Sequence, residues 1–249
     1  MTPKEKALNR LQDDTPLPPE EFYALLPACE NNALLLVYVA ERKSLRLPPE
    51  YEAIIAQDSL QSLKYAERVL KGPFLQGEAA IASNIGDGLQ YAERVLQGSF
   101  PKMEPLLYAS GAPYQLASYA LDCAKTRLPL EAEQKILTDL SLAFFYARDI
   151  LKGPWPELEA ALLPETPTYL GLGACVRYAD EVLKKPWPAL EPLLLAFDKE
   201  KPLYLGLALD YATKVKCPLP KNIHEQLMEF DGLLYDFHHK VLDYALAVG

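Results

Sequence analysis

The sequence has no apolar stretch long enough to cross a membrane. Its longest apolar run, ALLLVYVA at 33–40, has eight residues, whereas a spanning helix needs about 20. The first ten residues, MTPKEKALNR, contain no apolar segment of the kind that a secretory signal carries. We therefore expect a protein that works in the cytoplasm and makes no use of a membrane.

Cysteine and histidine are scarce, and their spacing does not suit chemistry. The four cysteines, at 29, 123, 175 and 217, form no CxxC pair, so we expect free thiols in a reducing compartment. His224 begins a HEQLM stretch that lacks the second histidine of a zinc-protease helix. His238 and His239 are adjacent, and neighbouring helical side chains point about 100° apart. We expect no metal, no cofactor and no enzymatic activity.

Clustered positive charge is missing as well. The chain has 25 Lys and Arg against 34 Asp and Glu, a net charge of −9, and both halves are acidic. Phosphate-backbone binding depends on clustered Lys and Arg, so we expect no direct binding to nucleic acid. No segment alternates polar and apolar residues as a half-buried strand would, and we expect no strands.

What the sequence does contain is an internal repeat centred on a Tyr-Ala pair. The clearest copies are YAERVLKGPF (65–74), YAERVLQGSF (91–100), YALDCAKTRL (119–128), YARDILKGPW (146–155) and YADEVLKKPW (178–187). Weaker copies begin at 39, 211 and 244, so the period is 26–28 residues at first and 32–33 later. A fixed period of this length is the signature of a repeat architecture.

A bulky residue stands nine positions after each tyrosine. The column consists of Phe74, Phe100, Leu128, Trp155 and Trp187, which accounts for both tryptophans of the chain. Four of these copies then place a glutamate four residues further on, at 78, 104, 159 and 191. Stacked repeats lie roughly 10 Å apart, too far for an acid–base pair. We expect these carboxylates either to cap free amides of a second helix or to bond a neighbouring tyrosine.

Each repeat is predicted to be a pair of helices. Apolar residues recur at helical spacing around Tyr-Ala, and capping patterns such as TPKE (2–5) and DSLQ (58–61) precede the helices. The first helix should end at Gly72, Gly98 or Gly153, where a left-handed cap residue is expected. In SNIGDGLQ (83–90) two glycines each cost about 1 kcal/mol within a helix, so we predict that this helix has a short or mobile first turn.

These features predict an all-α fold, a right-handed α-solenoid of about eight helix-turn-helix repeats with a period of 26–33 residues. A capping helix is expected at 231–248. We expect one domain over 1–249, with a bend near residue 160, where the period lengthens.

The Tyr-Ala copies resemble α-solenoids in general and, more closely, the short helical repeats of uncharacterised bacterial and bacteriophage proteins. The period and the absence of a Trp-Leu-Gly-Tyr order set the chain apart from tetratricopeptide and pentatricopeptide repeats. The resemblance implies a binding scaffold and carries over no catalytic residue. If it extends to bacteriophage proteins, it implies an inhibitor or adaptor that acts on a bacterial defence protein.

Two functions remain open from the sequence. The first is a non-enzymatic scaffold for another protein, with Tyr169, Tyr204 and Tyr235 as candidate partner-binding residues, because they lie outside the repeat register and interfaces are enriched in tyrosine. Filling of the longer C-terminal hairpins would explain these tyrosines equally well. The alternative is an acidic nucleic-acid mimic or an RNA-associated repeat protein. For RNA reading, the lysine column of 71, 152 and 184 is incomplete, since Gln97 and Thr126 replace it in other copies.

Overall fold

The protein is all-helical in the part of the chain that the structure describes. The computed structural model describes residues 1–163, 168–195 and 202–218. No strand occurs within these ranges, so the prediction of an all-α protein is confirmed for them. The capping helix expected at 231–248 lies outside the described residues.

Two kinds of helix alternate after an N-terminal pair. That pair is α1 (Pro3–Gln12) and α2 (Pro19–Leu25), which continues into a 3₁₀ turn, η1 (Leu26–Cys29). The first helices of the repeats contain the Tyr-Ala pair or lead directly into it, except that α3 has Val39-Ala40 in its place. They are α3 (Ala33–Lys43), α5 (Ser59–Lys64), α7 (Ile85–Gln90), α9 (Pro113–Ser118), α11 (Leu140–Tyr146), α13 (Tyr169–Tyr178) and α15 (Pro202–Val215). The second helices are α4 (Pro49–Ile55), α6 (Glu78–Ala82), α8 (Glu104–Ser110), α10 (Leu130–Ile136), α12 (Pro156–Leu162) and α14 (Glu191–Leu195).

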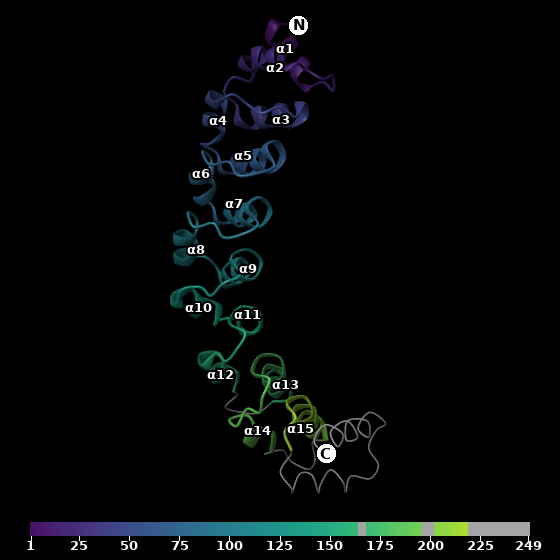
Figure 1. Ribbon diagram of the computed structural model, residues 1–249, viewed down its shortest axis with the longest axis vertical. Coiled ribbons are helices and arrows are strands. Elements are labelled where there is room, and N and C mark those ends of the chain that lie inside the picture. Colours follow the sequence, from purple (N-terminus) through teal and green to yellow (C-terminus); the bar gives the residue numbers. More distant parts are fainter. Residues whose placement is uncertain (164–167, 196–201, 219–249) are drawn as a thin grey trace. The chain divides into compact units, whose positions relative to one another are not determined.

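The chain divides into two compact units, Met1–Lys135 and Ile136–Gly249. Within each unit the first helices lie along one side and the second helices along the other (Figure 1). Inside a unit, first helices of successive repeats contact one another, as η2 and η3 do in unit 1 and α13 and α15 do in unit 2. The expected single domain over 1–249 and its bend near 160 stay predictions.

Short polar side chains fix where the first helices begin. The carboxylate of Asp58 accepts the N–H of Gln61, and Asp139 accepts those of Ser141 and Leu142. At the N-terminus, Thr2 and Glu5 form the capping box that TPKE predicts. Each such bond satisfies an amide that the helix leaves free, a contribution of about 1 kcal/mol.

The prediction for residues 83–90 is wrong. Asn84 caps the helix by accepting the N–H of Asp87, and α7 begins directly at Ile85 and runs without a break into η3, which ends at Leu96. Gly88 is required by packing, because a Cβ there would lie 2.3 Å from Sδ of Met103. The glycine that lowers helix propensity therefore allows the start of α8, the second helix of the same repeat, to pack closely, and tertiary packing overrides propensity.

Five first helices end in a π segment rather than in a regular α turn. These segments are η2 (Tyr65–Leu70), η3 (Tyr91–Leu96), η4 (Tyr119–Ala124), η5 (Ala147–Leu151) and η6 (Ala179–Leu183). A π segment takes in one extra residue. The left-handed residue consequently stands six positions after the tyrosine, as Lys71 does after Tyr65, whereas Lys216 stands five after Tyr211 in α15, which has none.

The left-handed position at the end of each first helix is not the glycine that the sequence predicts. The residues with positive φ there are Ser44, Lys71, Gln97, Lys125, Lys152, Lys184 and Lys216, with φ between 50° and 53°. Gly72 and Gly98 follow this position, and each donates its N–H to the carbonyl of the alanine in the Tyr-Ala pair at 3.1 Å. The column also corrects the sequence register: Lys125, not Thr126, occupies it after Tyr119.

Candidate functional site

The most regular feature of the structure is a hydrogen-bond lock between successive repeats. The hydroxyl of Tyr65 accepts the N–H of Leu47 at 2.9 Å and donates to Oε1 of Glu52 at 2.9 Å. Four later tyrosines bond the preceding repeat in the same way: Tyr91 to Phe74 and Glu78, Tyr119 to Phe100 and Glu104, Tyr178 to Trp155 and Glu159, and Tyr211 to Trp187 and Glu191. We call this arrangement the tyrosine lock.

The lock decides between the two roles that the sequence allowed for the repeated glutamates. Glu78, Glu104, Glu159 and Glu191 each accept a hydrogen bond from the tyrosine of the following repeat. Burial of the phenols raises the pKa of Tyr91 and Tyr178 to about 12, so both stay protonated donors at neutral pH. The carboxylates are therefore structural acceptors.

The bulky column completes the same lock. Phe74, Phe100, Trp155 and Trp187 are all buried. Each ring packs on the tyrosine nine residues before it, with centroids 5.1 Å apart for Tyr65–Phe74 and 5.5 Å apart for Tyr178–Trp187. The side chains of the column thus fill the space within a repeat. Their backbone N–H groups donate hydrogen bonds to the tyrosine hydroxyl of the following repeat.

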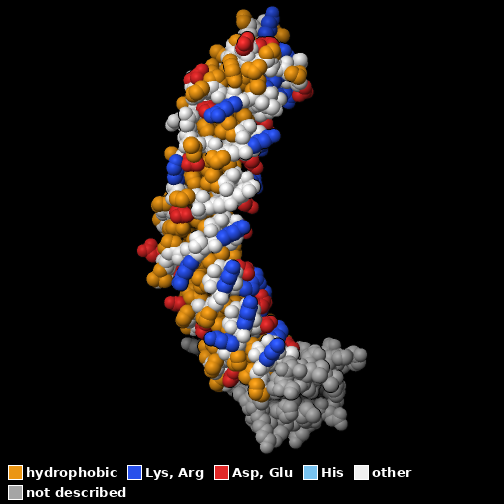
Figure 2. Space-filling model, in the orientation of Figure 1, with side chains coloured by type: hydrophobic (Ala, Val, Ile, Leu, Met, Phe, Trp, Pro, Cys, Tyr) orange, Lys and Arg blue, Asp and Glu red, His pale blue; other side chains and the backbone are white. Residues whose placement is uncertain are grey.

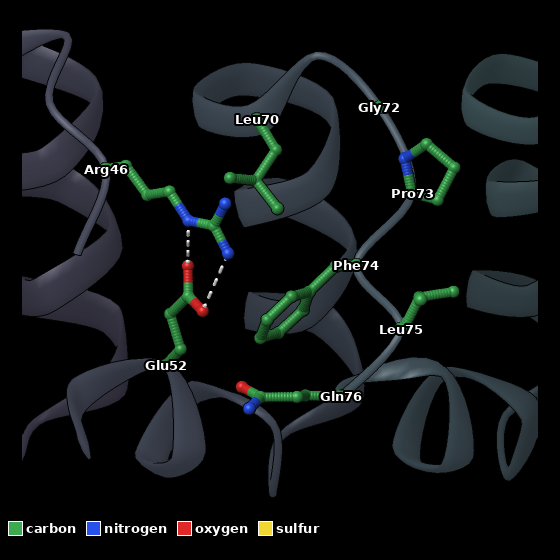
Figure 3. Close-up of a pocket in the computed structure, with 8 residues that line it drawn as sticks. All are labelled: Arg46, Glu52, Leu70, Gly72, Pro73, Phe74, Leu75 and Gln76. Carbon is green, nitrogen blue, oxygen red and sulfur yellow. Dashed lines mark hydrogen bonds and ion pairs between the residues drawn. The ribbon is translucent and has the colours of Figure 1, made fainter. Parts of the chain in front are cut away.

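In unit 1, arginines near the surface bind two buried glutamates, of which Glu52 belongs to a tyrosine lock. Arg46 donates from Nε and Nη2 to the two carboxylate oxygens of Glu52, at 2.7 and 3.2 Å, beside an open recess of about 550 Å³ (Figure 3). Arg127 bonds Glu133 in the same two-pronged way, at 2.8 and 2.9 Å. Because Arg46 and the buried Glu52 neutralise each other, this recess offers little charge to a ligand.

The sequence also raised metal binding and thiol chemistry. Within the described ranges, no group of three or more His, Cys, Asp or Glu side chains is arranged to hold a metal. Cys29, Cys123 and Cys175 are buried, and burial raises the pKa of each thiol to about 11, which keeps it protonated and a weak nucleophile. The three histidines lie outside the described residues.

The best candidate for a binding site is an apolar groove between the first helices α11 and α13 in unit 2. It has a volume of about 320 Å³ and is lined by Leu140, Ser141, Phe144, Phe145, Leu162, Gly173, Ala174 and Arg177. Leu140 and Phe145 are exposed on α11, and Leu170, 83% exposed, precedes Ala174 by one turn of α13. We call this surface the α11–α13 groove.

Arginines frame one side of the groove. The guanidinium of Arg177 lies 4.6 Å from the ring centre of Phe144, and that of Arg148 lies 4.9 Å from the ring centre of Phe145. Both arginines bond Glu181, Arg177 at 2.6 Å and Arg148 at 3.0 Å. Stacking and ion pairing together fix the aromatic side chains in place before any partner arrives.

Gly173 keeps the groove open. A Cβ at this position would meet only Leu207, at 3.9 Å, so the neighbouring helix does not require a glycine. Gly173 lines the groove beside Ala174, so a larger side chain there would take up part of its open volume. Gly173 therefore differs from Gly77, where a Cβ would lie 2.5 Å from the ring of Phe74.

The structure describes one of the three tyrosines predicted to bind a partner. Tyr169 begins α13 and is 42% exposed, one turn before Gly173 and thus on the same side of the helix. Tyr204 lies in α15, but its side chain is outside the described residues, as is the whole of Tyr235. The assignment of these three residues to a binding surface stays a prediction.

Sequence reasoning missed the residues that form the groove. Phe145 directly precedes the tyrosine of its repeat, and Leu140 begins the same helix. A comparison of the residue before each tyrosine would have singled out Phe145, because Lys64, Gln90 and Ser118 stand there in earlier repeats. Its exposure, 36%, shows that the phenyl ring is not needed to fill the core.

No helix among the described residues has the length and apolar character needed to cross a membrane. Comparison of the chain with protein-family models, with curated proteins and with solved structures found no match.

Proposed function

We propose that the chain is a non-enzymatic α-solenoid scaffold that binds another protein, and that the α11–α13 groove receives the partner. The observation that carries the proposal is the set of exposed apolar side chains, Leu140, Phe145 and Leu170, beside stacked arginines. Interface centres are enriched in aromatic residues and arginine. Pre-ordered side chains also lose little entropy when a partner binds.

The solenoid part of the proposal rests on contacts between sequence neighbours. Each tyrosine lock joins one repeat to the repeat before it, and inside each unit the first helices of successive repeats contact one another. Such nearest-neighbour stacking is how α-solenoids build an extended binding surface. The repeated Tyr and Glu side chains are used in these locks, which supports a scaffold rather than an enzyme.

Site-specific photo-crosslinking in cells tests the docking site. A photoreactive benzoylphenylalanine replaces Phe145 in the α11–α13 groove or, as the control, Tyr114, which is 62% exposed in unit 1. We expect a protein adduct at position 145 that Gly173→Leu abolishes, and no such adduct at position 114. Equal adducts at both positions, or none at 145, would refute the groove. An adduct that nuclease removes would favour the nucleic-acid-associated alternative.

Tyr169→Ser separates binding from core filling. If Tyr169 belongs to the binding surface, the variant weakens the crosslink at position 145 while the melting temperature stays that of the wild type. A fall in melting temperature together with the loss of crosslinking would show that the ring is part of the packing of α13.

A further inference from the structure

Left-handed lysines stand at the C-terminal ends of the first helices in unit 2. Lys152, Lys184 and Lys216 end the three first helices of this unit, each with φ of 52° or 53°. None of the three forms an ion pair within the described part of the chain. The nearby acids are bonded to other cations: Asp149 and Glu181 to Arg148, and Asp180 to Lys214.

Lysine is not the residue that the backbone conformation favours at these positions. A left-handed φ costs a residue with a Cβ about 1 kcal/mol, and glycine avoids this cost. A cation gains about 0.3–1 kcal/mol from the dipole at a helix C-terminus, which roughly balances that cost. Gln97 stands at the equivalent position of unit 1, so the fold accepts an uncharged residue there. The local structure alone therefore does not require three lysines.

Two of these lysines line a recess that continues the α11–α13 groove. The recess has a volume of about 580 Å³ and is lined by Arg148, Asp149, Lys152, Glu181, Val182 and Lys184, at the C-terminal ends of η5 and η6. Lys and Arg side chains gather over α11 to α13 on the face that Figure 2 shows. Arg148 stacks on Phe145 in the groove and also lines the recess. The apolar groove and this basic recess thus follow one another along the same two first helices.

We infer that the partner presents a short segment with apolar residues at one end and acidic residues at the other, which lies along α11 and α13 with its carboxylates at Lys152 and Lys184. The inference rests on the proposed function and names the chemistry of the partner. From Leu140 to Lys152 the helix spans about 18 Å, the length of a helix of about twelve residues or an extended segment of about six. An apolar-to-acidic segment of that length matches both surfaces.

A protein segment fits this surface better than a nucleic acid. Asp149 and Glu181 lie in the same recess as the lysines, and a continuous phosphate backbone would meet them. The chain as a whole carries a net charge of −9, which repels an extended polyanion but matters little for two or three carboxylates placed within a Debye length of the lysines.

The test is a binding selection with the full-length chain against random peptides of about twelve residues displayed on yeast. The informative variant is Lys152→Gln/Lys184→Gln, and the matched control is Lys71→Gln/Lys125→Gln, which removes the same charge from the same backbone position in unit 1. Selected peptides should carry Asp or Glu at one end and apolar residues at the other. We expect the unit 2 variant to bind them at least about tenfold more weakly and the control to bind normally, with the difference shrinking from about 50 to about 300 mM NaCl.

The other outcomes are distinguishable. The selected peptides could be apolar throughout, with binding that Gly173→Leu blocks and that the lysine variant does not change. This result would overturn the acidic segment and support the groove. Acidic peptides that bind equally well to the Gly173→Leu variant would overturn the groove as the docking place. Tighter binding of a single-stranded oligothymidylate, lost in the lysine variant, would assign the surface to nucleic acid. Selection of no peptide would refute both proposals.

Discussion

Removing one hydroxyl from a tyrosine lock should destabilise the protein without disturbing its packing. In Tyr91→Phe the fully buried ring remains, but the N–H of Phe74 loses its acceptor at 2.9 Å and Glu78 loses a donor at 3.1 Å. An unsatisfied buried amide costs about 1–3 kcal/mol, and a hydrogen bond to a carboxylate contributes about 1.5–3 kcal/mol. Glu78 keeps Lys102 at 2.8 Å, so we expect a total loss of about 2–4 kcal/mol.

The control for this prediction is an exposed tyrosine of the same unit. Tyr114 makes no hydrogen bond with the described part of the chain and is 62% exposed, so Tyr114→Phe should change the free energy of unfolding by less than about 0.5 kcal/mol. Urea unfolding gives the change in the free energy of unfolding for each variant. Hydrogen exchange at the Phe74 amide reports the lock directly and does not depend on two-state unfolding of the whole chain. If Tyr91→Phe is as stable as the control and the Phe74 amide remains protected, the lock does not stabilise the fold.

Three further predictions concern packing, pH and glycine. Trp155→Ala should cost about 3–5 kcal/mol, with hydrogen-exchange protection lost first in the neighbouring helices; uniform loss along the chain would contradict this. Since Tyr91 and Tyr178 ionise at about 12 in the fold and near 10 when unfolded, the stability they contribute is complete below pH 10 and is lost as the pH rises through 12. Tyrosinate absorbance should therefore rise together with loss of helical circular dichroism, and separate transitions would refute the coupling. Gly173→Ala should raise stability by up to about 1 kcal/mol, whereas Gly77→Ala should lower it by about 1–3 kcal/mol; melting temperatures in the opposite order would contradict the packing argument.

The helical repeat could be predicted from the sequence because helix spacing and helix capping depend on residues only a few positions apart. The Tyr-Ala spacing indicates first helices, and side chains such as Thr2 and Asp58 mark helix starts that the structure confirms. The interaction of the repeated glutamates with tyrosine was one of two predicted roles, since the spacing alone does not say which donor faces a carboxylate.

What the sequence could not predict depends on how one helix packs against another. The glycines of 83–90 suggested a weak helix start, but Gly88 lies against Met103 at the start of α8, the second helix of the same repeat, and the gain in packing outweighs the propensity cost. Lys125, by contrast, stands six residues after Tyr119, as Lys71 does after Tyr65, so the sequence itself places it in the lysine column in place of Thr126. The α11–α13 groove needs two helices side by side, which no single-helix pattern reveals.

The direction of the tyrosine lock has a consequence for synthesis on the ribosome. Every lock points backwards: the hydroxyl that satisfies an amide belongs to a tyrosine 17 to 24 residues later in the chain. A newly made repeat therefore exposes a free amide and a carboxylate that lacks its tyrosine donor until the next first helix has left the exit tunnel. The tyrosine locks must therefore close in the order of translation. In stalled nascent chains of increasing length, each repeat should become protease-resistant only after the repeat that follows it has emerged.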